Sequence, residues 1–190
     1  MTTQLASPSI AILVANGFEE NHITAVQRTL TKDGFSYKII APEQGLVNGW
    51  QDNAWGHYFT VDEMISTAMG SDYDMLVLIG GERATSKLKA NLHTRRIVNH
   101  FLEAGKPVAA IGTGVELLAL SPKSLGLLVS APAQSADAVA TAAMTKEEAA
   151  QTQDGTVLTA DGSDTEAWVA GLMDTVTSFE PEMDEDAQAA

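Results

Sequence analysis

Short apolar runs recur along the chain, bounded by Gly, Pro, Asn or Asp. The clearest cover residues 9–15 (SIAILVA), 37–42 (YKIIAP), 74–81 (DMLVLIGG) and 108–111 (VAAI), and GTVLTA at 155–160 is similar. Apolar residues follow one another here instead of alternating with polar ones, which is typical of strands buried on both faces of a parallel sheet. The sequence therefore predicts five buried strands.

Between these runs, apolar residues recur at helical spacing. One predicted helix carries Ile23, Val26 and Leu30 on one face and ends at Gly34; the others include residues 97–102 and 168–179. Glycines between aromatic residues predict a hairpin over 45–59. Downstream, LGLLVSAP at 125–132 favours a strand, and residues 135–150 have the composition of a helix.

Alternating strands and helices predict an α/β fold, with a mostly parallel sheet between layers of helices. We expect one domain over residues 9–179, after an N-terminal extension at 1–8. Residues 180–190 are acidic and lack periodicity, which predicts a disordered tail. Ligands of such sheets bind beyond the carboxyl ends of the strands. The loops at 16–22, 80–85 and 112–115 are therefore the candidate site.

Charge and composition exclude several classes of partner and of chemistry. The net charge of -14 argues against nucleic acid and against anionic membranes. The chain has no cysteine, so it forms no disulfide and has no thiolate chemistry. No apolar run reaches the length of a membrane span, and the first residues lack the features of a signal peptide. We expect a cytoplasmic protein without a cofactor.

Four motifs in register resemble the DJ-1/PfpI superfamily, and in particular its bacterial PfpI-like branch. They are ANGFEENHI at 15–23, GWQDNAWGHYFTVDE at 49–63, YDMLVLIGG at 73–81 and GKPVAAI at 105–111. The resemblance implies a flavodoxin-like three-layer sandwich and self-association into a dimer or larger oligomer. It also implies an association with peptidase or amidase, glyoxalase, deglycase and stress-response roles.

The family's chemistry depends on a cysteine at a sharp turn between a strand and a helix, and that position is Gly112 here. The histidine that often follows the cysteine is replaced by Thr113. The glutamate that hydrogen-bonds the thiol matches His22. Glycine tolerates the conformation of such a turn without a Cβ penalty, so the turn can persist after the chemistry is lost.

The vestigial pocket therefore contains Gly112, Thr113 and His22, and we assign no catalytic residue. The candidates for ligand binding are Glu19, Glu20, His22, Gly80, Gly81, Gly112, Thr113 and Gly114. No metal site is expected, because His93 and His100 lie seven residues apart instead of four. His57, within the predicted hairpin, is expected to face solvent.

These observations favour a pseudoenzyme that binds a small ligand in a regulatory or stress-related role. The C-terminal domains of large catalases are a precedent, because they resemble the superfamily and also lack the cysteine. One alternative is a divergent hydrolase or lyase with His22 as base and Thr113 as nucleophile, although Thr113 is better interpreted as a helix N-cap. The other alternative is a structural or assembly module.

Overall fold

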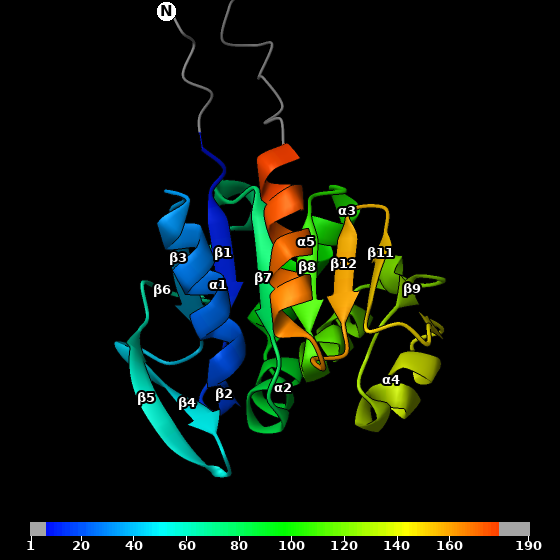
Figure 1. Cartoon of the computed structure of the whole chain (residues 1–190), viewed down its shortest axis with the longest axis horizontal. Coiled ribbons are helices and arrows are strands. Elements are labelled where there is room, and N and C mark those ends of the chain that lie inside the picture. The colour runs from blue at the N-terminus through cyan, green and yellow to red at the C-terminus, as the bar shows by residue number, and fades with distance from the viewer. Residues whose placement is uncertain (1–6, 179–190) are drawn as a thin grey trace, which may run out of the picture.

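The computed structural model describes residues 7–178, and a seven-stranded sheet lies at its centre (Figure 1). The strands in spatial order are β11 (Gln151–Asp154), β12 (Val157–Ala160), β8 (Val108–Ile111), β7 (Met75–Ile79), β1 (Ile10–Leu13), β3 (Tyr37–Ala41) and β6 (Glu63–Met64). Only β11 pairs antiparallel with its neighbour. The order β3-β1-β7-β8-β12 is the flavodoxin-like order, so the predicted fold class is confirmed.

The five predicted strands all form, and the reason is burial. Every residue of β1, β7, β8 and β12 is buried, as are the last three of β3. Strands covered by helices on both faces have no solvent side, so each of their positions favours an apolar residue.

Helices cover both faces of the sheet (Figure 1). Helices α1 (Glu20–Lys32) and α5 (Thr165–Ser178) pack together in front of it in this view. Helix α3 (Leu92–Glu103) lies behind it, and α2 (Glu82–Lys89) lies beyond the lower ends of the strands, in contact with the 3-10 helix η2 (Gly112–Leu120). Trp168 of α5 is fully buried against the sheet. Among residues 7–178, no helix combines the length and apolar character needed to cross a bilayer.

The predicted hairpin is also present, and it extends beyond the edge of the main sheet. Strands β4 (Leu46–Gln51) and β5 (Ala54–Thr60) pair antiparallel, and β2 (Phe18–Glu19) pairs with β4. Asp52 and Asn53 connect the two strands with φ of 50° and 60°. This left-handed pair matches the twist of the strands, and Asp and Asn tolerate it better than most residues.

The region after β8 differs most from the prediction. Of the helix expected over 135–150, only α4 (Ala136–Thr141) forms, and Ala143 has a positive φ of 54°. Helix α4 is rich in alanine and presents only Val139 as a buried residue, so it has no apolar stripe to stabilise a longer helix. Strand β11 was not predicted, because this exposed edge strand contains no apolar residue.

The remaining elements are short. They are β9 (Leu128–Val129), β10 (Thr145–Lys146), η1 (Gly70–Asp72), η3 (Pro122–Ser124) and η4 (Ala133–Ser135). Residue 179 and the predicted acidic tail lie outside the described residues, as does most of the predicted N-terminal extension.

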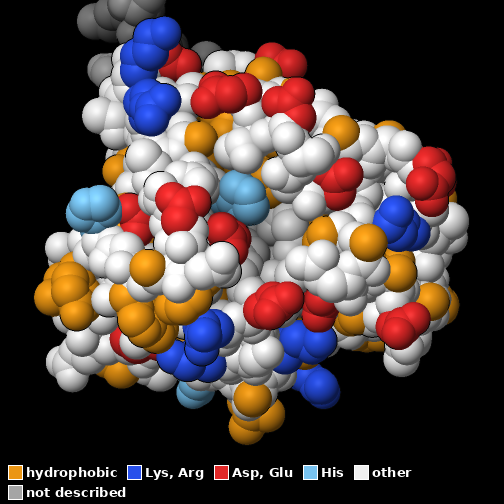
Figure 2. Space-filling model, turned by 60° about the horizontal axis from the view of Figure 1, so that its bottom comes forward, with side chains coloured by type: hydrophobic (Ala, Val, Ile, Leu, Met, Phe, Trp, Pro, Cys, Tyr) orange, Lys and Arg blue, Asp and Glu red, His pale blue; other side chains and the backbone are white. Residues whose placement is uncertain are grey.

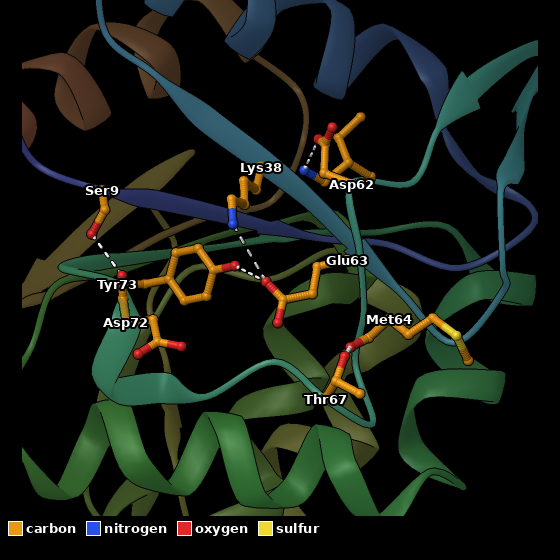
Figure 3. Close-up of polar contacts among 9 residues, drawn as sticks. Ser9, Lys38, Asp62, Glu63, Met64, Thr67, Asp72 and Tyr73 are labelled. Carbon is orange, nitrogen blue, oxygen red and sulfur yellow. Dashed lines mark hydrogen bonds and ion pairs between the residues drawn. The ribbon is translucent and has the colours of Figure 1, made fainter.

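A polar cluster links the edge strand β6, which pairs with the last two residues of β3, to Lys38 of β3 and to Tyr73 just before β7 (Figure 3). The Tyr73 hydroxyl donates to Glu63 Oε2 at 2.6 Å, and Lys38 Nζ lies 3.6 Å from the same oxygen. Burial raises the pKa of Tyr73 above its usual range, and the hydrogen bond to Glu63 and the negative charge of Glu63 raise it further. The phenol therefore stays protonated and keeps donating to Glu63.

Candidate functional site

A cavity of about 800 Å³ lies at the carboxyl ends of the parallel strands. Figure 2 shows this end of the molecule, with a hollow bordered by acidic side chains (red) and a histidine (pale blue). The loops after β1, β7, β8 and β12 line the cavity together with the β4–β5 hairpin. This is the crevice where flavodoxin-like sheets bind ligands, and its volume is in the range of small-molecule sites.

His22 and Gly112 meet in this cavity, although 90 residues of sequence separate them. Gly112 has φ of +60°, so the left-handed turn expected after the strand is present. A Cβ at Gly112 would lie 3.5 Å from His22 Cε1, and a Cβ at Gly162 would lie at the same distance. The imidazole thus lies beside two backbone segments without side chains, and there is room for a Cβ at residue 112.

The His22 ring is held in its neutral form. Burial lowers its pKa to about 4. Its Nδ1 atom is shielded from solvent and has no hydrogen-bond partner among the described residues. A neutral imidazole offers one donor and one acceptor nitrogen. The shielded Nδ1 is closed to the cavity, so a polar ligand would meet the other part of the His22 ring, which borders it.

We expect His22 to make stability depend on pH. The unfolded chain protonates this histidine below about 6.5, whereas the folded chain keeps it neutral down to about 4. The unfolded state therefore binds more protons between these values, and the free energy of unfolding falls as the pH drops through this window. Between pH 7 and pH 5 the loss should be on the order of 1 kcal/mol.

Urea denaturation at the two pH values measures this loss. The His22→Gln variant has no titrating ring, so it should lose correspondingly less stability over the same interval. An equal loss in both proteins would contradict the prediction.

Thr113 borders the cavity, but its hydroxyl is already hydrogen-bonded within the protein. Thr113 is 6% exposed. Its Oγ1 accepts a hydrogen bond from the Gly81 N–H at 2.9 Å and forms a second one with Thr85 Oγ1, also at 2.9 Å. The Thr113 hydroxyl therefore joins Gly81, in the loop after β7, to Thr85 of α2. The expectation that Thr113 caps the following helix is wrong, because Ile111 occupies the N-cap position and no side chain caps it. This arrangement gives no support to a nucleophilic role.

The predicted glycines act mainly as close backbone contacts. Gly81 and Gly112 border the cavity, but Gly80 and Gly114 are absent from its lining. A Cβ at Gly80 would lie 2.6 Å from the Ile111 carbonyl oxygen, and one at Gly114 would lie 2.7 Å from that of Leu78. These two positions require glycine so that the loops after β7 and β8 can touch.

Charged and aromatic residues form the rest of the wall. Glu19, Glu82 and Asp161 line the cavity, with Arg83 and Trp50. The Arg83 guanidinium lies 4.4 Å from the centre of the Trp50 ring, a cation–π contact.

Burial raises the pKa of Glu19, and the nearby charges of Glu82 and Asp52 raise it further. The cavity therefore has a negative electrostatic character.

Glu20 does not line the cavity, although the sequence made it a candidate for ligand binding. Its carboxylate is turned to the hairpin, where it contacts the backbone and ring of His57. His57 is solvent-facing as expected, with a side chain 85% exposed, but its Nδ1 lies 2.5 Å from Glu20 Oε1.

Several lining residues were missed from the sequence. Asp161 and Gly162 directly follow β12. The rule that sites lie beyond the carboxyl ends of strands would have identified them, because GTVLTA was recognised as a strand. Arg83 lies in the loop at 80–85 that the sequence placed in the candidate site, whereas Trp50 had no such signal, because its position depends on how the hairpin folds. In residues 7–178, no three His, Asp or Glu side chains gather as a metal site would require.

Comparison with known proteins places the chain in context. The model of the DJ-1/PfpI family matches residues 8–174. Catalase-2 of Bacillus subtilis is 29% identical over 112 residues, which cover 57% of this chain and 15% of the catalase. Deglycase PfpI of Pyrococcus furiosus is 30% identical over 109 residues, which cover 57% of this chain and 63% of the deglycase. The matches thus span less than two thirds of these relatives.

A solved structure agrees in fold. The crystal structure of a ThiJ/PfpI domain protein from Brachyspira murdochii superposes with a TM-score of 0.81 at 18% identity, covering 90% of this chain and 96% of that one. At this level of identity the likeness concerns the fold alone.

Proposed function

Since the chain belongs to the DJ-1/PfpI family, we propose that it is a non-catalytic member that binds a small polar ligand in the cavity beside His22 and Gly112. A regulatory or stress-related role, as the family resemblance suggests, is part of this proposal. The observation that carries it is an open cavity with a glycine where the family has its cysteine.

The chemistry of the site supports ligand binding over turnover. Without cysteine the family's thiol-dependent reactions have no nucleophile. The Thr113 hydroxyl is already bonded to Gly81 and Thr85, so it does not replace the thiol. The neutral His22 ring borders a cavity large enough for a metabolite.

The charges favour a neutral or cationic ligand. Three carboxylates line the cavity, and the single guanidinium of Arg83 lies over Trp50. The net charge of -14 adds a long-range field that attracts cations and repels anions. Hydroxyl and ammonium groups would find acceptors in Glu19, Glu82 and Asp161.

A charge-matched set of sugars tests this preference. Glucosamine, glucose and glucuronate share one ring and differ in charge, and NMR titration gives their dissociation constants. We expect glucosamine to bind most tightly and glucuronate most weakly, with about a tenfold range or more. Ser86→Trp, at an exposed helical position on the lining, should weaken binding by occupying part of the cavity. Preferred binding of glucuronate, or binding unaffected by Ser86→Trp, would overturn the proposal.

We also propose self-association through the hairpin. Strand β5 is the free edge of its small sheet, and its sequence AWGHYFT carries no Asp, Glu, Lys or Arg. Trp55 and Tyr58 expose 54% and 68% of their surface there. Two copies of a strongly acidic chain meet with least repulsion at such an uncharged strand.

Light scattering at micromolar concentration should give at least the mass of a dimer. The Trp55→Lys, Tyr58→Lys double variant should be shifted towards the monomer. A monomeric mass for the unchanged protein would contradict self-association without affecting the ligand test.

A further inference from the structure

We propose that Glu20 is a positioning residue, whose carboxylate holds the β4–β5 hairpin against α1 and thereby sets one wall of the cavity. We call Glu20 and its contacts with His57, Gly49 and Gly56 the Glu20 anchor. The proposal rests on the proposed function for its biological meaning, but its test needs no ligand.

The carboxylate is buried and satisfied by the hairpin. Glu20 is 5% exposed, at the first residue of α1. Its Oε2 accepts the backbone N–H of His57 at 2.8 Å, and its Oε1 lies 2.5 Å from His57 Nδ1. Burying a carboxylate is costly unless hydrogen bonds replace its water, so both oxygens depend on the hairpin being in place.

The hairpin is shaped to receive this carboxylate. The pairing register between β4 and β5 shifts between Asn48 and Trp50, which is the irregularity of a β-bulge. Opposite this shift, the His57 N–H donates to Glu20. The side chain from α1 therefore satisfies a backbone donor at the point where the ladder is irregular.

Two glycines leave the space that Glu20 occupies. A Cβ at Gly49 would lie 2.6 Å from Glu20 Oε2, and one at Gly56 would lie 1.8 Å from it. Neither glycine has a positive φ, so backbone conformation does not explain them. The need to leave room for the Glu20 carboxylate explains both glycines.

The hairpin held in this way carries part of the cavity wall. Trp50 and Asn53 line the cavity, and the Trp50 ring lies against Arg83 of α2. The hairpin also pairs with Phe18 and Glu19 of β2, and Asn48 exchanges hydrogen bonds with the Asn16 side chain and the Gly17 N–H. The Glu20 anchor adds to these contacts at the register shift beside Gly49, the residue before Trp50, and so helps to set where Trp50 lies.

Hydrogen exchange tests the proposal directly. In Glu20→Gln, backbone exchange over residues 46–60 should be about tenfold faster or more, while β7 and β8 keep their protection, because the hairpin opens locally. Glu148→Gln is the matched control, since that side chain is 95% exposed. Unchanged exchange in the hairpin, or an equal increase throughout the sheet, would overturn a positioning role.

A second variant keeps the carboxylate and removes its space. Gly56→Ala places a methyl group where Glu20 Oε2 lies, so it should raise hairpin exchange as Glu20→Gln does. Because both changes break the same contact, the double variant should exceed the larger single effect only slightly. Additive effects would show that the two residues act independently, and would also overturn the proposal.

The cavity itself supplies the third readout, His22. If the wall moves away, water enters and the His22 pKa, measured by NMR, should rise from about 4 towards 6.5 in Glu20→Gln. Loss of the negative charge of Glu20 alone would lower this pKa, so the direction separates the two causes. An unchanged or lowered His22 pKa would contradict control of the cavity by Glu20. These outcomes stand whether or not any sugar binds.

Discussion

Replacing Gly81 with alanine is expected to destabilise the protein by about 3–5 kcal/mol, among the largest effects of any single substitution. Gly81 has φ of +126°, a conformation that residues with a Cβ rarely adopt. The added Cβ would also lie 2.5 Å from the Gly17 carbonyl oxygen and 2.8 Å from Phe18 Cα. These are backbone atoms of the loop after β1, so relief requires the loops around the cavity to separate.

Gly34→Ala is the matched control for this experiment. Gly34 has φ of +80°, but a Cβ there would have no neighbour within 4 Å. Its cost should be backbone strain alone, about 1 kcal/mol. Chemical denaturation of both variants gives the two losses of free energy. Similar losses would show that the close approach at Gly81 is unimportant, whereas failure of Gly81→Ala alone to fold would agree with the prediction.

Introducing a thiol at residue 112 should create a reactive centre that the natural chain lacks. In Gly112→Cys the new Cβ has room beside His22, at 3.5 Å from Cε1, and the left-handed backbone should cost about 1–2 kcal/mol of stability. The family resemblance places a glutamate at the position of His22. Adding His22→Glu should therefore supply a carboxyl group that donates a hydrogen bond to the thiolate and lowers the pKa of the thiol.

The rate of alkylation by iodoacetamide at neutral pH measures this effect. The double variant should react about tenfold faster than Gly112→Cys alone. Ser71→Cys, at an exposed position near the amino ends of the strands, gives the rate of an ordinary surface thiol. If the double variant reacts no faster than this control, residue 112 is not equivalent to the family's cysteine position.

Part of the candidate site could be predicted from the sequence, because motifs report on local geometry. Gly112 at a left-handed turn and His22 in the motif after β1, at the start of α1, both belong to short recognisable segments, and the structure brings them together. Glu20 was assigned to ligand binding because it lies in the same loop. Its carboxylate points instead to the hairpin, and nothing in the local sequence indicates the direction of that side chain.

The sequence by itself determined the fold class and which segments form the buried central strands. Continuous apolar runs such as residues 75–79 and 108–111 can be satisfied only inside a covered sheet, so their burial follows from composition alone. Absence of cysteine likewise settled what chemistry is missing. These properties depend on each segment's own residues.

Only the tertiary structure decided which side chains form the cavity and how its walls are held. The Trp50–Arg83 contact, the space beside Gly49 and Gly56, and the neutral state of His22 all arise between segments distant in sequence. Helix length after residue 135 was likewise set by packing, because an alanine-rich segment without an apolar stripe gains little from continuing as a helix. Burial and close contact are properties of the folded neighbours, which no local pattern contains.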